Sequence, residues 1–312
     1  MHIQWKGVYP ALTSPLTKDD SIDVELFRLN LRAQIDAGVD GLIVGGSLGE
    51  ASVLEAGERE LLLKVAMEEA EGRIPSILNI AEGSTREAIR QAKLAVKWGA
   101  DGLMVLPPMR YKSDERETVH FYKSIAASVD LPIMVYNNPV DYRIEITPAM
   151  FDELLDCDNI QAVKESTRDV TNVTRLVNRF GDRLKILCGV DTLAMEELML
   201  GADGWVAGLV CAFPKETVAI YRLLKAGYSE EARRIYRWFM PLLELDIHPK
   251  LVQYIKMAQA ATGLGSEYVR APRLVLEGEE RKYVQSVIEE GLRRRPALPD
   301  YLNLREVAVP TA

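Results

Sequence analysis

The sequence predicts an α/β protein, namely a (β/α)8 TIM barrel with a C-terminal three-helix appendage. Eight short apolar runs alternate with amphipathic helical patterns, and a Gly-x-Asp-Gly motif recurs three times where a helical pattern gives way to an apolar run. Such strands are typical of a parallel sheet buried on both faces, and eight helix-to-strand units predict a closed barrel. The strand signal stops near Lys225, and this change predicts the appendage.

The eight predicted strands start near residues 8, 41, 76, 102, 133, 160, 185 and 204. In chain order they read VYPALTS, GLIVGG, SILNIA, GLMVLPP, IMVYNN, IQAVKE, KILCGV and GWVAGLV. Between them lie helical patterns such as STREAIRQAKLAVKWG. In this pattern Ser84 and Glu87 fit a capping box, and one apolar face is formed by Ala88, Ala92, Ala95 and Val96.

The repeated motif marks the passage from a helix to the next strand. Its three copies are DAGVDG (36–41), KWGADG (97–102) and MLGADG (199–204). The first glycine of each copy suits the left-handed residue that ends a helix, and the Asp-Gly pair suits a tight entry into a strand. We therefore expect left-handed backbone at Gly38, Gly99 and Gly201.

Three further helical patterns follow the barrel, at 229–246, 250–263 and 277–294. Their apolar faces can pack against the barrel or against a neighbouring subunit. The final stretch, RRRPALPDYLNLREVAVPTA, has two prolines near charges and is interpreted as a tail that can clamp a partner chain. We assign residues 1–224 to the barrel, 225–293 to the appendage and 294–312 to the tail.

Composition and charge exclude several classes of protein. A chain of 312 residues, 48% of them hydrophobic, can bury a large core. The net charge of −8 comes from acids and bases mixed along the chain, so nucleic acid is not an expected partner. No apolar run reaches the roughly 18 residues of a membrane span, and the start MHIQWKGVYP lacks the regions of a signal peptide. We expect a cytoplasmic protein without membrane contact.

The cysteines and histidines predict neither a metal nor another cofactor. Cys157, Cys188 and Cys211 are widely spaced, without a CxxC pair, and are expected to be buried thiols. The three histidines share no motif with acidic neighbours at metal-ligand spacing. A metal-dependent lyase on a barrel therefore loses support.

Lys164 ends the sixth predicted strand, in the stretch IQAVKESTRD (160–169). Barrel active sites lie at the carboxyl ends of the strands, so this amine is expected to face the catalytic mouth. The fifth strand ends in MVYNNP, which places Tyr136 at the neighbouring strand end as an acid/base partner for imine chemistry. Two alternatives stay open: a lysine turned to solvent or paired with an acid, and a tyrosine that fills the barrel.

The second predicted strand ends in GGSLGEAS (45–52). Glycines let the backbone turn tightly, so the Ser47 hydroxyl and the amides after it can face one anionic group, which we expect to be a carboxylate. The segment lacks the residue order of a phosphate-binding loop.

Together these motifs resemble a known family. GGSLGEA, YNNP, VKES and CGVD, at the second, fifth, sixth and seventh strands, are similar to the dihydrodipicolinate synthase and N-acetylneuraminate lyase superfamily. The resemblance covers about residues 6–293. It implies a class I mechanism, in which Lys164 attacks the C2 carbonyl or imine carbon of a substrate of the 2-oxo acid type. Free lysine has a pKa near 10.4, so burial must lower the pKa of Lys164.

The resemblance also implies roles for other residues. Tyr136 shuttles protons at the forming imine, Ser47 and the amide of Leu48 hold the substrate carboxylate, and Gly189 leaves room for the substrate chain. It further implies a homotetramer built as a dimer of dimers, which the appendage permits. The expected partner is a small-molecule carboxylate substrate.

Two departures from the synthase pattern bear on the substrate. Dihydrodipicolinate synthases carry an arginine two residues after the proline of Y-N-x-P, where it grips a second carboxylate, whereas here Val140 and Asp141 follow Pro139. They also use a tyrosine that reaches across the dimer from the loop after the fourth strand. Met109 takes that position here, and Tyr111 is the candidate substitute.

The motifs PPMRY and YNNPVDY resemble the 1-pyrroline-4-hydroxy-2-carboxylate deaminases of hydroxyproline breakdown. In that reaction Lys164 adds to C2 of the cyclic imine, a proton leaves C3 and the C4 hydroxyl departs as water. Hydrolysis then releases ammonia and 2,5-dioxopentanoate. Met109 would offer the ring an apolar wall, and Asn138 would either bind the substrate hydroxyl or brace the turn.

Three alternative functions stay open. A 2-keto-3-deoxy sugar acid aldolase or dehydratase shares the lysine and the tyrosine, with Asp191 either binding a sugar hydroxyl or, as we favour, capping the following helix. The second alternative is dihydrodipicolinate synthase. The third is a non-catalytic sensor that binds a 2-oxo acid on the same scaffold, although a pure binder would not need a buried amine.

Overall fold

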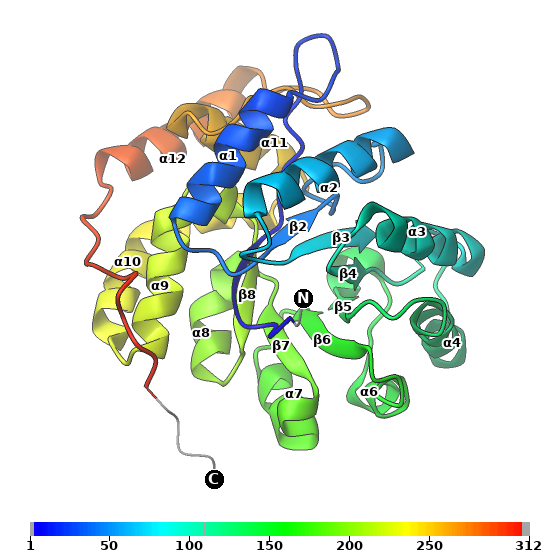
Figure 1. The fold of residues 1–312 in the computed structure, drawn as a ribbon. Helices are drawn as coiled ribbons and strands as arrows, with labels where there is room; N and C mark the ends of the chain where they lie inside the picture. The colour runs from blue at the N-terminus through cyan, green and yellow to red at the C-terminus, as the bar shows by residue number, and fades with distance from the viewer. Residues whose placement is uncertain (1–2, 109, 308–312) are drawn as a thin grey trace.

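The computed structural model describes residues 3–108 and 110–307 and shows the predicted barrel (Figure 1). Strands β2 to β8 pair in chain order and β8 pairs with β1, all in parallel. A parallel bridge between Ala11 and Ile43 brings β1 beside β2, so the sheet nearly closes on itself. The strands are β1 (Gly7–Pro10), β2 (Leu42–Val44), β3 (Ser76–Ile80), β4 (Gly102–Val105), β5 (Ile133–Asn137), β6 (Ile160–Glu165), β7 (Lys185–Cys188) and β8 (Gly204–Ala207).

Helices surround the sheet (Figure 1). Because side chains fill the barrel inside and helices cover it outside, strands such as β3 and β5 are buried along their whole length. This explains why the sequence shows continuous apolar runs instead of alternation. The covering helices are α1 (Val24–Asp36), α2 (Ala56–Ala70), α3 (Thr85–Trp98), α4 (Glu115–Ala126), α6 (Pro148–Leu154), α7 (Thr171–Phe180), α8 (Ala194–Met199) and α9 (Pro214–Lys225), with short 3-10 turns η1 (Gly181–Arg183), η2 (Asp191–Leu193) and η3 (Leu209–Cys211). The short helix α5 (Pro139–Tyr142) lies instead at the barrel mouth, after β5.

The Gly-x-Asp-Gly motif has one geometry in its three copies. Gly38, Gly99 and Gly201 have φ angles of +86°, +91° and +108°, so the predicted left-handed helix ends are confirmed. The aspartate of each copy accepts a hydrogen bond from a backbone amide of the preceding strand. These bonds, of 2.8 to 2.9 Å, join Asp40 to Val8, Asp101 to Ser76 and Asp203 to Ile186. The motif therefore ties each new strand to the one before it.

Helix α3 follows its sequence pattern in part. Ser84 caps the helix by accepting a hydrogen bond from the Glu87 amide at 3.3 Å, but the Glu87 side chain binds Arg90 and does not close the predicted capping box. The three predicted alanines are buried, whereas Val96 is 48% exposed. Each residue turns the helix by about 100°, which carries Val96 past the apolar face that ends at Ala95.

The appendage consists of α10 (Ser229–Leu243), the 3-10 turn η4 (Glu244–Ile247), α11 (Leu251–Thr262) and α12 (Gly278–Arg293). These elements gather on one side of the barrel, near α9 and α1 (Figure 1). After α12 the chain returns to the barrel, since Arg295 pairs with Glu216 of α9 and the Val307 amide donates to the Lys225 carbonyl at 2.9 Å. The three-helix appendage is confirmed, and the boundaries at residues 224 and 293 stay a prediction.

No helix among the described residues has the length and apolar character that crossing a membrane requires. The cytoplasmic location expected from the sequence remains untested.

Candidate active site

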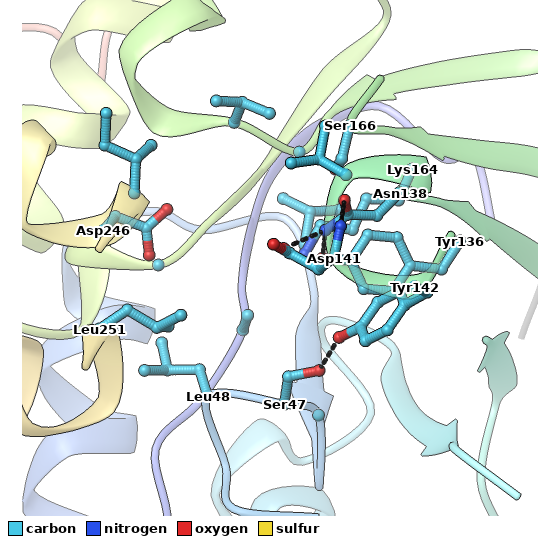
Figure 2. A pocket seen from close by; sticks show the side chains of 18 of the residues that line it. Ser47, Leu48, Tyr136, Asn138, Asp141, Tyr142, Lys164, Ser166, Asp246 and Leu251 are labelled. Carbon is cyan, nitrogen blue, oxygen red and sulfur yellow. Dashed lines mark hydrogen bonds between the residues drawn. The ribbon is translucent and has the colours of Figure 1, made fainter. Parts of the chain in front are cut away.

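Lys164 lies in β6 and faces the barrel mouth, as the sequence predicts (Figure 2). It is paired in register with Tyr136 of β5, and its Nζ lies 4.2 Å from the centre of the Tyr136 ring. The side chain is only 7% exposed and forms no hydrogen bond or ion pair with any other described residue. Burial lowers the pKa of Lys164, and the nearby Asp246 opposes this shift. Within the described ranges, Lys164 is therefore neither turned to solvent nor paired with an acid, the two alternatives considered for it above.

Tyr136 stands beside this amine with its hydroxyl held by Asn138. The Asn138 Nδ2 donates to the Tyr136 hydroxyl at 3.2 Å and to Asp141 Oδ2 at 2.7 Å. The Asn138 side chain also accepts a hydrogen bond from the Asp141 amide and so caps α5, the brace considered for it above. Burial raises the pKa of Tyr136 to about 12, so its hydroxyl stays protonated at neutral pH. A contact between Asn138 and substrate is still a prediction.

Ser47 and Leu48 lie in the loop after β2 and line the same cavity. The Ser47 hydroxyl forms a 2.5 Å hydrogen bond with the hydroxyl of Tyr142, whose ring packs edge-on against Tyr136 with centroids 5.6 Å apart. Burial raises the pKa of Tyr142 as well. The sequence analysis missed Tyr142, although its signal was present in YNNPVDY, where only the residues nearer the strand were given roles.

The tyrosine proposed as a substitute lies elsewhere. Tyr111 is 57% exposed and does not line the described cavity. Within one chain, the hydroxyl that reaches Ser47 therefore belongs to Tyr142. The apolar wall predicted at Met109 lies outside the described residues.

The site is a cavity of about 450 Å³ between the barrel mouth and the appendage. Its barrel side carries Lys164, Tyr136 and the Ser47 loop, and its other side carries Asp246 and Leu251 of the appendage (Figure 2). A cavity of this size fits a small molecule with few heavy atoms. The sequence analysis gave the appendage only a packing role, and no motif marked its contribution to the cavity.

Gly189, directly after β7, provides space for Lys164. A Cβ atom at this position would lie 2.6 Å from Lys164 Cγ and would collide with Ser166 Oγ. Gly189 also lines the cavity, so the predicted room for the substrate chain is compatible with its position but untested. The aliphatic part of the Lys164 side chain already occupies the space beside this glycine.

Asp191 does not have either role considered for it. It is fully buried, its carboxylate accepts hydrogen bonds from Trp205 Nε1 at 2.9 Å and from the Leu209 amide at 2.8 Å, and it does not line the cavity. The sequence analysis favoured a helix N-cap, and this was wrong because the side chain turns toward the end of β8. Asp191 therefore fixes the chain after β8.

No group of three or more His, Cys, Asp or Glu side chains is placed to hold a metal ion within the described residues. The side chains that line the cavity offer an amine, two phenols, two hydroxyls, an amide, two carboxylates, a guanidinium and an imidazole.

Comparisons with known proteins agree on the family. A model described as the dihydrodipicolinate synthetase family matches residues 4–291. A 4-hydroxy-tetrahydrodipicolinate synthase of Exiguobacterium sibiricum is 33% identical over 275 residues, which cover 87% of this chain and 92% of the relative. A synthase of the same name from Methanospirillum hungatei is 30% identical over 271 residues, covering 86% and 93%.

Solved structures of dihydrodipicolinate synthases are similar to this chain over most of its length. The 4-hydroxy-tetrahydrodipicolinate synthase of Methylacidiphilum fumariolicum has a TM-score of 0.88 at 29% identity, covering 92% of this chain and 96% of that one. A structure described as the first monomeric dihydrodipicolinate synthase variant has a TM-score of 0.86 at 26% identity, covering 92% and 97%. The homotetramer therefore stays a prediction for this chain.

The relatives' names support the synthase alternative better than the deaminase resemblance, which no comparison confirms. The wider superfamily resemblance is confirmed, because the family model covers nearly the whole chain. The chain belongs to the dihydrodipicolinate synthetase family.

Proposed function

We propose that the protein is a lyase in which Lys164 forms a Schiff base with a small 2-oxo acid. The observation that carries this proposal is a buried, unpartnered lysine that faces a cavity beside a tyrosine. Burying an amine without a partner costs free energy, and a reaction that uses the neutral amine as a nucleophile explains why the site retains it.

The geometry supports a simple sequence of steps. The substrate carboxylate binds the Ser47 hydroxyl and the Leu48 amide, which places C2 toward Lys164. The neutral amine attacks C2, and the carbonyl oxygen leaves as water once it is protonated. Tyr136, protonated at neutral pH, supplies this proton and then accepts one when the adduct is processed.

Borohydride reduction in the presence of pyruvate tests this proposal. Mass spectrometry should find one reduced adduct on Lys164, and Lys164→Arg should abolish it. Absence of an adduct from the native protein would reject the lyase and favour the non-catalytic sensor.

The first candidate reaction is the synthesis of 4-hydroxy-tetrahydrodipicolinate, because the curated relatives carry that name. The synthases carry an arginine two residues after the proline, and this chain has Asp141 at that position. Another arginine, Arg168, lines the cavity from the loop after β6. A second carboxylate therefore has one candidate cation.

The second candidate is deamination of 1-pyrroline-4-hydroxy-2-carboxylate to 2,5-dioxopentanoate and ammonia. One observation favours it: Asp141 occupies the place of the synthase arginine and lines the cavity, where a carboxylate would repel a second substrate carboxylate. A compact ring with a single carboxylate avoids this repulsion.

Product analysis separates these reactions. Ammonia from the pyrroline hydroxy acid supports the deaminase, and 4-hydroxy-tetrahydrodipicolinate from its precursors supports the synthase. Pyruvate released from a 2-keto-3-deoxy sugar acid without ammonia would instead support the aldolase, although the fully hydrogen-bonded Asp191 no longer contributes to that case.

A further inference from the structure

Asp246 reaches the active-site cavity from the appendage. It belongs to η4, between α10 and α11, and lines the cavity together with Lys164. A Cβ atom on Gly208, at the end of β8, would collide with Asp246 Oδ1. Gly208 has a φ of −96°, which any residue can adopt, so a glycine is needed there for space and not for backbone shape. The barrel thus makes room for this carboxylate.

The Asp246 carboxylate has no partner inside the protein. It forms no hydrogen bond and no ion pair with any other residue in the described ranges, unlike Asp191, which accepts bonds from three neighbours. Figure 2 shows Asp246 on the opposite side of the cavity from Tyr136 and Tyr142. Burial, reinforced by Asp191, raises the pKa of Asp246 well above its usual range. A carboxylate with such surroundings has hydrogen-bonding capacity available for a ligand.

Asp141 of α5 adds a second carboxylate to the cavity, beside Asn138 and across from Asp246 (Figure 2). Its Oδ2 accepts a hydrogen bond from Asn138, while no described residue donates to its Oδ1. Arg168 also lines the cavity and opposes the rise in the pKa of Asp246, but it forms no ion pair with either acid within the described residues. A ligand group that lies between the two acids is therefore favoured when it is cationic or donates a hydrogen bond, because both carboxylates repel an anion.

Lys164 indicates which end of a ligand meets these acids. This unpartnered amine, 7% exposed, opens into the same cavity and would hold C2, while the Ser47 loop would hold the carboxylate beside it. Because Lys164 and the Ser47 loop occupy the barrel side of the cavity, the rest of the ligand chain extends toward the appendage. The far end of the substrate therefore faces Asp141 and Asp246.

We propose that Asp246, with Asp141, forms a distal subsite for the C5 ammonium of a five-carbon 2-oxo acid. In the corresponding cyclic imine this nitrogen is bonded to C2, and it reaches the subsite when Lys164 has added to C2, the C2–N bond of the ring breaks and the nitrogen takes up a proton. This inference rests on the proposed function, because Lys164 must bind C2 for the far end to reach the two acids. It makes the appendage a determinant of substrate choice.

Three probes test the subsite: 1-pyrroline-2-carboxylate, 2-oxoglutarate and pyruvate. The first two share a five-carbon chain. Once Lys164 has added to C2 and the ring has opened, the pyrroline carries an ammonium on C5, where 2-oxoglutarate has its second carboxylate, while pyruvate lacks any distal group. The measurement is the probe concentration that gives half-maximal modification of Lys164 after cyanoborohydride reduction, read by mass spectrometry. The variants are Asp246→Asn and the control Glu145→Gln, which removes an exposed charge that does not line the cavity.

We expect the native protein to prefer the pyrroline to 2-oxoglutarate. Loss of one charge-assisted contact in Asp246→Asn should raise the half-saturating pyrroline concentration by about 10- to 100-fold. The half-saturating concentration of pyruvate should change little in Asp246→Asn. Glu145→Gln should have the same half-saturating concentrations as the native protein for all three probes.

Two results would overturn the subsite. One is an Asp246→Asn variant with unchanged preference between the two five-carbon probes, and the other is an equal loss for all three probes, which would indicate a structural role for Asp246. If the native protein forms no adduct with any probe, the proposed function itself fails, so the two failures are distinguishable.

Discussion

A buried ion pair joins the loop after β2 to the appendage. Lys256 of α11 donates to Glu50, three residues after Ser47, and both side chains are 1% exposed. Lys256 also donates to the Tyr268 carbonyl at 2.7 Å, and Glu50 accepts the Arg270 amide at 3.0 Å. The Glu50 amide in turn donates to the Ser47 carbonyl at 3.1 Å. The pair thus supports the loop on which the proposed carboxylate site depends.

Replacing Lys256 with methionine should destabilise the fold strongly. The substitution keeps much of the side-chain volume but removes the nearer of the two cations beside the buried Glu50, leaving only Arg273 at 3.8 Å. Loss of a buried charged partner typically costs about 3 to 5 kcal/mol. For 312 residues the entropy of unfolding is about 0.66 kcal/mol per degree, so the melting temperature should fall by about 5 to 8 °C. Replacing both partners, as Glu50→Gln with Lys256→Met, removes the unpaired charge and should recover part of this loss.

Thermal and urea unfolding of the single and double variants measures these effects. Lys64→Met is the matched control, because Lys64 pairs with Glu60 on the surface at 54% and 36% exposure, and its loss should change stability by less than about 0.5 kcal/mol. If Lys256→Met is as stable as Lys64→Met, or if the double variant is less stable than Lys256→Met, the reasoning about the buried pair is wrong.

Three further predictions follow from the site and its surroundings. Gly189→Ala should overpack the Lys164 stem, costing about 1 to 3 kcal/mol of stability and slowing adduct formation in the borohydride assay, and unchanged adduct kinetics would contradict the packing argument. Tyr142→Phe removes the hydroxyl that binds Ser47 and should weaken substrate binding by about 10-fold, visible as a higher KM, whereas an unchanged KM would show that Tyr142 is dispensable. Burial raises the pKa of Glu197 to about 8, and both of its carboxylate oxygens lack a hydrogen-bond partner. Because the unfolded chain loses this proton near pH 4.5 and the folded chain only near pH 8, stability falls between these values by up to about 1.4 kcal/mol per pH unit. Glu197→Gln should therefore stabilise the protein increasingly from pH 5 to pH 8 in thermal unfolding, and a pH-independent difference would contradict the shifted pKa.

The sequence predicted the barrel and its central lysine because both depend on local patterns. Apolar runs of strand length define β1 to β8, and parallel strands bring their carboxyl ends to one edge. Lys164 and Tyr136 were therefore expected together, and they are register partners in the structure. The left-handed glycines were predictable for the same reason, since one residue and its immediate neighbours decide the backbone shape.

Other features required the folded chain. Tyr142 meets Ser47 across 95 residues of sequence, and Lys256 meets Glu50 across 206. The sequence analysis looked for the missing hydroxyl at Tyr111 because it compared motifs position by position. Within one chain the structure places Tyr142 at Ser47, since α5 follows Pro139 and its residues line the cavity. The role of Tyr111 across a dimer stays a prediction.

The sequence by itself determined the fold class and the position of Lys164 at the barrel mouth, and it predicted the loop expected to bind a carboxylate. Only the tertiary structure decided which hydroxyl reaches Ser47, that the lysine stem uses the space beside Gly189, and that Asp246 closes the far side of the cavity. The physical reason is that hydrophobic periodicity and turn chemistry act over a few residues, whereas the chemistry of a cavity depends on side chains that distant segments bring together when the barrel and its appendage pack.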